Sequence, residues 1–172
     1  MNRYPMRKNP RLEGWDYTAD GIYFITFCTR NHCHVLSSVG RGGLYGRPPP
    51  ELTELGICVD QAIREIVRRT GVRMEHQVIM PNHVHLLVLL ERAAIKAAPT
   101  GKPQPCSVGR IVGAIKSRAV CLARARGLPA ASLWQRGYYD HIIRGEEDFL
   151  RIWTYLDNNP QKWELDRYYT QT

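Results

Sequence analysis

Apolar residues follow two different periodicities along the chain, and together they mark seven elements. Three stretches have apolar residues at helical intervals of three and four, and four stretches are rich in β-branched and aromatic residues between turn signals. The predicted strands cover residues 21–29, 72–80, 84–90 and 133–144, and the predicted helices cover residues 52–69, 107–126 and 146–159. Pro160 ends the last helix, because proline cannot continue a helical hydrogen-bond ladder.

The order of these elements predicts the fold class. Strand, helix, strand, strand, helix, strand is the βαββαβ order of a ferredoxin-like α+β domain, in which helices pack on one face of an antiparallel sheet. The helix over 146–159 is a C-terminal addition to that unit. The sequence shows no internal repeat and no change in composition that would mark a second domain. We therefore expect residues 1–172 to form a single domain.

Two internal segments and the N-terminus differ in composition from the rest. Residues 40–50 are rich in glycine and proline but lack GxGxxG spacing, so we expect a mobile connection rather than a phosphate-binding loop. Residues 92–105 are rich in alanine, proline and lysine and predict a flexible loop. Residues 1–16 form a basic N-terminal arm.

The net charge narrows the class of partner. The chain has 24 Lys and Arg against 16 Asp and Glu, a formal net charge of +8, which favours a polyanionic partner such as nucleic acid. No apolar run approaches the roughly 20 residues that span a bilayer, and the N-terminus lacks the apolar core of a secretion signal. Five scattered cysteines without a CxxC pair are typical of a cytosolic protein, so we expect a cytoplasmic location and no membrane partner.

A short patch carries four side chains that could bind a soft metal. Cys28, His32, Cys33 and His34 lie within seven residues. Zinc sites usually combine two such ligand pairs from distant parts of the chain, and no second pair is present. We therefore favour a strand end that runs into a polar turn over a metal site.

A second candidate metal site is the sequence His83-Val84-His85 at the start of a predicted strand. Alternate side chains of a strand point the same way, so both imidazoles leave one face of the sheet. Two imidazoles suit a divalent cation, with oxygen ligands completing its shell. The alternative is that both are simply polar residues at a strand start.

Tyr155 and Asn159 are four residues apart on the last predicted helix. Residues at this spacing share a helix face, so both side chains can project into one site. The alternative makes Tyr155 an amphipathic residue at the core edge and Asn159 a helix cap in the left-handed conformation.

Basic residues mixed with aromatic ones predict contacts to DNA, because cations bind phosphates and aromatic rings stack on unpaired bases. A run of charge is otherwise only a solvated face. The predicted DNA-binding residues are Arg3, Arg7, Lys8, Arg110, Lys116, Arg118, Trp134, Arg136, Tyr138 and Arg144.

Four blocks of the chain, in the same order, resemble a known family. The segment Met80–Val88, MPNHVHLLV, closely resembles the HUH motif of the single-tyrosine transposases of insertion sequences. Trp134-Gln135, Tyr138–Arg144 and Tyr155–Pro160 are similar to downstream blocks of that family, most of all in its REP-associated tyrosine transposase branch. The similarity runs from about Tyr17 to Trp163.

The resemblance implies a metal-dependent endonuclease and strand transferase that acts on single-stranded DNA with hairpin or palindromic ends, in the bacterial cytosol. It makes His83 and His85 ligands of Mg²⁺ or Mn²⁺, Asn159 the third ligand, and Tyr155 the nucleophile that forms a 5′-phosphotyrosine. His141 is the nearest candidate base, although a structural role is favoured. Members of the family act as monomers or homodimers, and both states stay open.

Two alternatives belong to other functional classes. The first is a domesticated relative that binds hairpins without cutting them, although such a binder needs none of His83, His85, Tyr155 and Asn159 to be intact. The second is a ferredoxin-like RNA-binding domain whose aromatic strands contact the bases.

Overall fold

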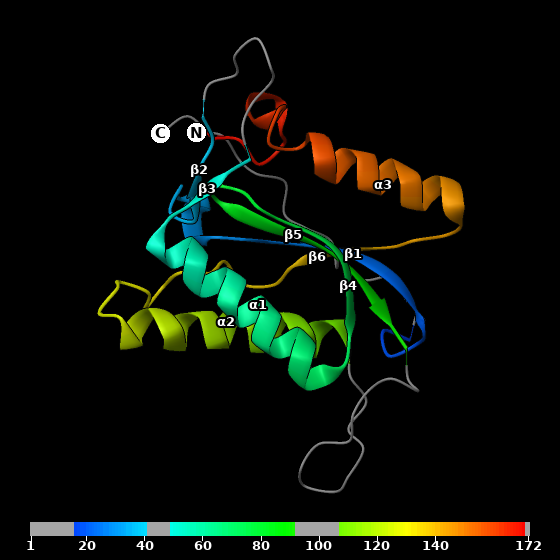
Figure 1. Cartoon of the computed structure of the whole chain (residues 1–172), viewed down its shortest axis with the longest axis horizontal. Coiled ribbons are helices and arrows are strands. Elements are labelled where there is room, and N and C mark those ends of the chain that lie inside the picture. The colour runs from blue at the N-terminus through cyan, green and yellow to red at the C-terminus, as the bar shows by residue number, and fades with distance from the viewer. Residues whose placement is uncertain (1–15, 41–48, 92–106, 171–172) are drawn as a thin grey trace, which may run out of the picture.

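Four antiparallel strands form the sheet at the centre of the molecule (Figure 1). The computed structural model describes residues 16–40, 49–91 and 107–170. The strands are β1 (Gly21–Cys28), β4 (Arg73–Ile79), β5 (His83–Leu90) and β6 (Tyr139–Ile142), and they lie in the order β4-β5-β1-β6. This order confirms the ferredoxin-like α+β fold predicted from the sequence.

The helices cover both faces of this sheet. Figure 1 shows α1 (Glu54–Thr70) and α2 (Val108–Ala125) side by side on one face and α3 (Glu146–Asn158) on the other. The prediction of helices packed on one face therefore holds for α1 and α2, and the added helix α3 takes the opposite face. Thr53 caps α1 by accepting a hydrogen bond from the Gly56 amide, and Gly71 ends the helix in the left-handed conformation.

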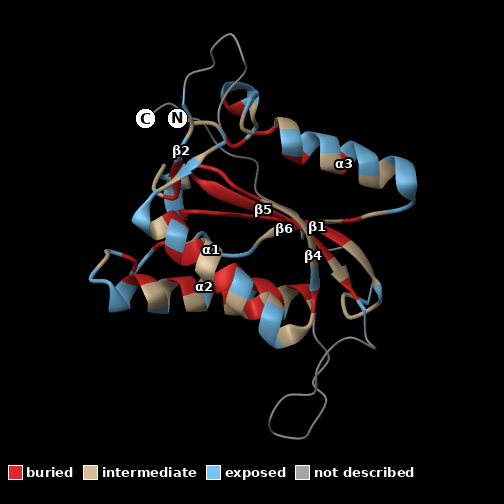
Figure 2. Ribbon diagram, in the orientation of Figure 1, coloured by how far each residue is buried: buried red, intermediate tan, exposed pale blue. Residues whose placement is uncertain are grey.

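Covering both faces divides the core into two clusters. Tyr23, Ile25 and Phe27 of β1 point into the larger cluster, under α1 and α2, whereas Phe24 points into the smaller one, under α3. The central strands are accordingly buried on both sides (Figure 2). Burial on both sides explains why the predicted strands have nearly continuous apolar runs.

Several short elements were not predicted. Two-residue strands β2 (Ser37–Ser38) and β3 (Glu51–Leu52) pair with each other, and 3₁₀ turns cover Arg30–His32 and Trp163–Leu165. None is long enough to generate a periodic pattern.

The predicted strand over 133–144 is too long. Only β6 joins the sheet, while Trp134 makes a single bridge with Thr29. Gly137 has φ +81°, so the chain turns there and leaves the sheet between these two points.

Some expectations fall outside the described residues. These are the basic arm up to residue 15, with Arg3, Arg7 and Lys8, residues 41–48 of the glycine-rich connection, and the predicted flexible loop 92–105. Within the described part, no helix is long and apolar enough to cross a membrane.

Candidate metal and nucleophile site

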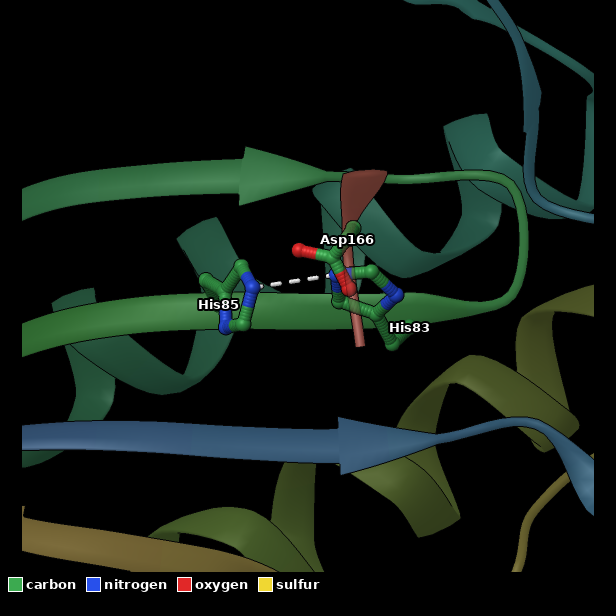
Figure 3. Close-up of side chains that lie close together, drawn as sticks. All are labelled: His83, His85 and Asp166. Carbon is green, nitrogen blue, oxygen red and sulfur yellow. Dashed lines mark hydrogen bonds between the residues drawn. The ribbon is translucent and has the colours of Figure 1, made fainter. Parts of the chain in front are cut away.

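The imidazoles of His83 and His85 leave β5 together on the face that α3 covers. Both side chains are fully buried, and their Nε2 atoms lie 3.0 Å apart (Figure 3). Val84 and Leu86, which alternate with them, pack into the cluster under α1 and α2. The predicted alternation of side chains along this strand is confirmed.

The neighbouring amide of Asn82 fixes the orientation of His83. Asn82 Nδ2 donates to the carbonyl oxygens of Tyr168, at 2.8 Å, and His32, at 3.2 Å. Its Oδ1 must therefore be the atom that faces His83 Nδ1, 2.8 Å away, and it can only accept. The proton of His83 consequently sits on Nδ1, and the lone pair of Nε2 is left for another partner.

His85 is held from the neighbouring strand. Thr26 lies directly opposite it in the register of β1 and β5, with Oγ1 2.7 Å from His85 Nδ1. A hydroxyl can donate or accept, so Thr26 fits either tautomer of His85. In one tautomer His85 Nε2 donates to His83, and in the other both Nε2 lone pairs face the same space.

Both imidazoles are neutral near physiological pH. Burial lowers the pKa of His83 to about 3, although the charge of Asp166 opposes that shift. Burial also holds the pKa of His85 well below its usual value. Neutral imidazole is the form that binds metal ions, so the pair needs no deprotonation to act as ligands.

Helix α3 brings Tyr155 and Asn159 to the histidines, as their spacing predicts. The Tyr155 hydroxyl lies 3.2 Å from His85 Nε2, and its ring packs edge-on against Phe24. Asn159 is buried and has φ −58°. Asn159 is thus the C-cap of α3, as the alternative predicts, although it keeps the right-handed conformation and not the left-handed one.

Asp166 lies at the centre of the site and was not identified from the sequence. Its Oδ2 accepts hydrogen bonds from the Tyr155 hydroxyl, at 2.9 Å, and from Asn159 Nδ2, at 2.6 Å. Possible ligand atoms of Asp166, His83 and His85 all lie within 4.8 Å of one another (Figure 3). Asp166 follows Pro160 in a segment without periodicity, and only its acidic character among aromatic residues could have marked it.

The segment that carries Asp166 also covers the histidines. Tyr168 is buried, with its ring centroid 4.7 Å from that of His83. Its amide donates to Asp166 Oδ1 at 2.7 Å. The tail of the chain is thus part of the site.

The phenol of Tyr155 is protonated in this arrangement. Burial is the main cause that raises its pKa above the usual value, and the negative charge of Asp166 raises it further. A nucleophilic role therefore needs positive charge or a proton acceptor close to the hydroxyl.

The residues present fit a divalent cation. Two ligand atoms about 2.1 Å from one ion and at right angles lie about 3 Å apart, which matches the separation of the two Nε2 atoms. Asn159 Oδ1 is buried and has no hydrogen-bond partner among the described residues, so one amide oxygen is available as a further ligand. With the Asp166 carboxylate, the set combines nitrogen and oxygen donors.

The structure also shows the surroundings of two other candidates from the sequence, the Cys28–His34 patch and His141. Cys28 ends β1 and Arg30–His32 form a 3₁₀ turn, so the patch is the strand end and polar turn that we favoured over a metal site. His141 Nε2 lies 2.8 Å from Asp148 Oδ2 and joins β6 to the start of α3. His141 therefore makes a contact between elements, consistent with the structural role favoured for it.

Three of the predicted DNA-binding residues come together. Trp134, Arg136 and Tyr138 line one pocket. Lys116 of α2 lies beside it, with Nζ donating to the carbonyl oxygens of Gln135 and Gly137 at 2.9 and 2.6 Å.

The other predicted DNA-binding residues of the described part lie elsewhere. Arg118 pairs with Glu65 at 2.5 Å and so links α2 to α1. Arg110 is exposed in the first turn of α2, and Arg144 is exposed between β6 and α3.

Comparison with known proteins shows a relative that matches nearly the whole chain. No protein-family model matches the sequence. An uncharacterized protein of Haemophilus influenzae is 33% identical over 178 residues, which cover 95% of this chain and 93% of that protein. The chain belongs to the family of that protein. The identity extends over nearly the full length of both, so the family shares the whole fold described above.

A solved structure has a similar fold. It is described as a REP-associated tyrosine transposase bound to a REP hairpin, with a TM-score of 0.57 and 22% identity. The match covers 91% of this chain and 77% of the other. At this identity, the match shows that the family fold described here is also that of a tyrosine transposase.

Proposed function

We propose that this protein is a metal-dependent transposase of the single-tyrosine kind, which cuts and rejoins single-stranded DNA with hairpin or palindromic ends. The observation that carries the proposal is the position of the Tyr155 hydroxyl. It lies 3.2 Å from Nε2 of His85, one of the two buried histidines. The similar fold of a transposase described as bound to a REP hairpin supports the choice of a hairpin substrate. The net charge of +8 supports a polyanionic partner.

His83, His85, Asn159 and Asp166 are the proposed ligands of Mg²⁺ or Mn²⁺. When bound, the cation would polarise the scissile phosphodiester and stabilise negative charge in the transition state. The protein contributes the neutral imidazoles, the unpartnered amide oxygen of Asn159 and the carboxylate. Asn82 and Thr26 hold the two imidazole rings in place.

Tyr155 is the proposed nucleophile. Its oxygen attacks phosphorus, and its proton passes to Asp166 Oδ2, to which the hydroxyl already donates. The bond from phosphorus to the 3′ oxygen breaks, and that oxygen takes a proton from solvent. The products are a 5′-phosphotyrosine and a free 3′-hydroxyl, and attack by another 3′-hydroxyl reverses the sequence without ATP.

The covalent intermediate provides the test. Incubation of the protein with end-labelled hairpin DNA and Mn²⁺ should give an adduct that survives SDS, and Tyr155→Phe should reduce it below detection while hairpin binding persists. Tyr139→Phe is the matched control that should keep the adduct. Loss of the adduct in this control would show that the nucleophile is elsewhere, and its absence from the wild-type protein over many hairpins would favour the non-catalytic binder.

A further inference from the structure

A pocket of about 950 Å³ opens beside the histidine pair, between the end of β1 and the segment that leads into β6. Its charged and aromatic walls include Arg30, Trp134, Arg136, Tyr138, Arg167 and Tyr168. Among the described residues that line it, none is acidic. The pocket therefore combines positive charge with aromatic surface.

The pocket adjoins the proposed catalytic site. Thr26, which contacts His85 Nδ1, is one of its walls, and the ring of Tyr168, which packs on His83, is another. An occupant of the pocket is therefore separated from the buried histidine pair by Thr26 and Tyr168.

Its cations are available for a ligand. Arg30 and Arg136 are exposed, and neither pairs with a carboxylate within the described part of the chain. The guanidinium of Arg167 lies over the Tyr139 and Tyr168 rings, 4.8 and 4.6 Å from their centroids. Guanidinium groups bind phosphate in a bidentate manner and stack on flat rings.

Lys116 holds the wall of the pocket that residues 134–137 form. Its ammonium lies 5.9 Å from the Trp134 ring and donates to the carbonyls on both sides of Arg136. The indole nitrogen of Trp134 donates back to the Lys116 carbonyl at 3.1 Å. Burial lowers the pKa of Lys116 to about 8, which reflects how far it has been withdrawn from solvent.

The opposite wall carries an uncommon backbone. Asn31 and His32 have φ of 55° and 54°, so two successive residues that are not glycine adopt the left-handed conformation. Such strained residues occur preferentially at ligand-binding sites, where the surrounding structure maintains them. Contacts within the protein therefore maintain the conformation of both walls, residues 134–137 and residues 31–32, in the absence of a ligand.

We propose that this pocket holds one unpaired nucleobase of the DNA strand that enters the catalytic site, stacked on Trp134 and Tyr138, with its flanking phosphates on Arg30 and Arg136. The identity of the partner as DNA rests on the proposed function. Aromatic rings beside cations are the usual means of holding a single strand. The side-chain amide of Gln135, also at the pocket, can pair with a base edge.

Binding measured without catalysis tests this. The full-length Tyr155→Phe protein in EDTA is titrated into a fluorescein-labelled hairpin with a single-stranded tail of six thymidines, and into the same hairpin with an abasic tail. The thymidine tail should bind about tenfold more tightly, the order expected for stacking of one base. Trp134→Ala should remove that preference, and Arg136→Ala should weaken both DNAs in parallel. Arg69→Ala, an exposed arginine at the end of α1, is the matched control and should change neither.

Photocrosslinking covers the case in which Trp134→Ala does not fold. With 5-iodouracil in the tail, the crosslinked peptide of the otherwise unchanged protein should contain Trp134 or Tyr138. Equal affinity for the two tails, or a crosslink that maps outside the pocket, would overturn the proposal. Tighter binding of the same tail as RNA would overturn its assignment to DNA. Because neither measurement needs cleavage, a negative adduct assay would count against the catalytic function and not against the pocket.

Discussion

At the scale of single residues, some side chains of the candidate site can be predicted from local sequence patterns and others cannot. His83, His85 and Tyr155 follow from strand alternation and helix spacing, since local geometry decides which way they point. Asp166 and Tyr168 reach the site only because the chain turns back after Pro160 and packs over β5. That return is a property of tertiary packing, which no local pattern encodes.

Asn159 allows the proposed metal role to be separated from a structural one. Asn159→Leu keeps the approximate volume but removes the amide oxygen, so Mn²⁺ affinity measured by calorimetry should fall at least tenfold. In the metal-free protein, the lost hydrogen bond to Asp166 costs about 1–3 kcal/mol, and removal of an unpaired buried oxygen returns a similar amount. The free energy of unfolding should therefore change little. A large loss of stability with unchanged Mn²⁺ affinity would make Asn159 structural.

At the scale of elements, the start of α1 helps to position the loop before the site. A Cβ on Gly56 would lie 1.9 Å from the carbonyl oxygen of Leu36. The Leu36 amide in turn donates to the carbonyl of Pro81, two residues before His83. Close approach of helix and loop at Gly56 is thus connected to the strand that carries the histidines.

A pair of glycine substitutions measures that approach. Gly56→Ala should destabilise the protein by about 1–3 kcal/mol, because the added methyl group meets backbone that cannot move aside cheaply. Gly113→Ala is the control in α2, where no atom of the described residues lies within 4 Å of the new Cβ, and it should stabilise by about 1 kcal/mol through helix propensity. Urea unfolding of both variants gives the comparison, and a shift of the same sign in both would contradict the packing argument.

Elements with sustained periodicity were predicted to within about two residues. The helix expected over 52–69 is observed as Glu54–Thr70, and that over 107–126 as Val108–Ala125. The exception is the strand expected over 133–144. Residues typical of a strand lie on both sides of Gly137, but the backbone turns at Gly137 and only Tyr139–Ile142 forms a strand. A glycine can continue a strand or turn out of it, and the sequence alone does not distinguish the two.

At the scale of the whole molecule, one chain provides every part of the candidate site. β5 carries the histidines, and α3 of the same chain places Tyr155 against them. A site completed within one chain does not need a second copy.

Mixing two inactive variants tests this. His83→Ala and Tyr155→Phe proteins combined in equal amounts should form no adduct, and the rate of adduct formation by the wild-type protein should rise linearly with its concentration. Recovery of the adduct in the mixture would mean that α3 is exchanged between chains.

The unequal size of the two core clusters has a consequence for motion. Helix α3 is held by the smaller cluster, whereas β1 and β5 also carry the larger one. Local opening should therefore release α3 while the sheet stays intact, since opening energies follow the apolar surface that is exposed. Native-state hydrogen exchange should show α3 amides exchanging through a smaller free energy than those of β1 and β5. Tyr155 and Asn159 would then leave the site together, as one hinged unit, while the two histidines stay on the rigid sheet.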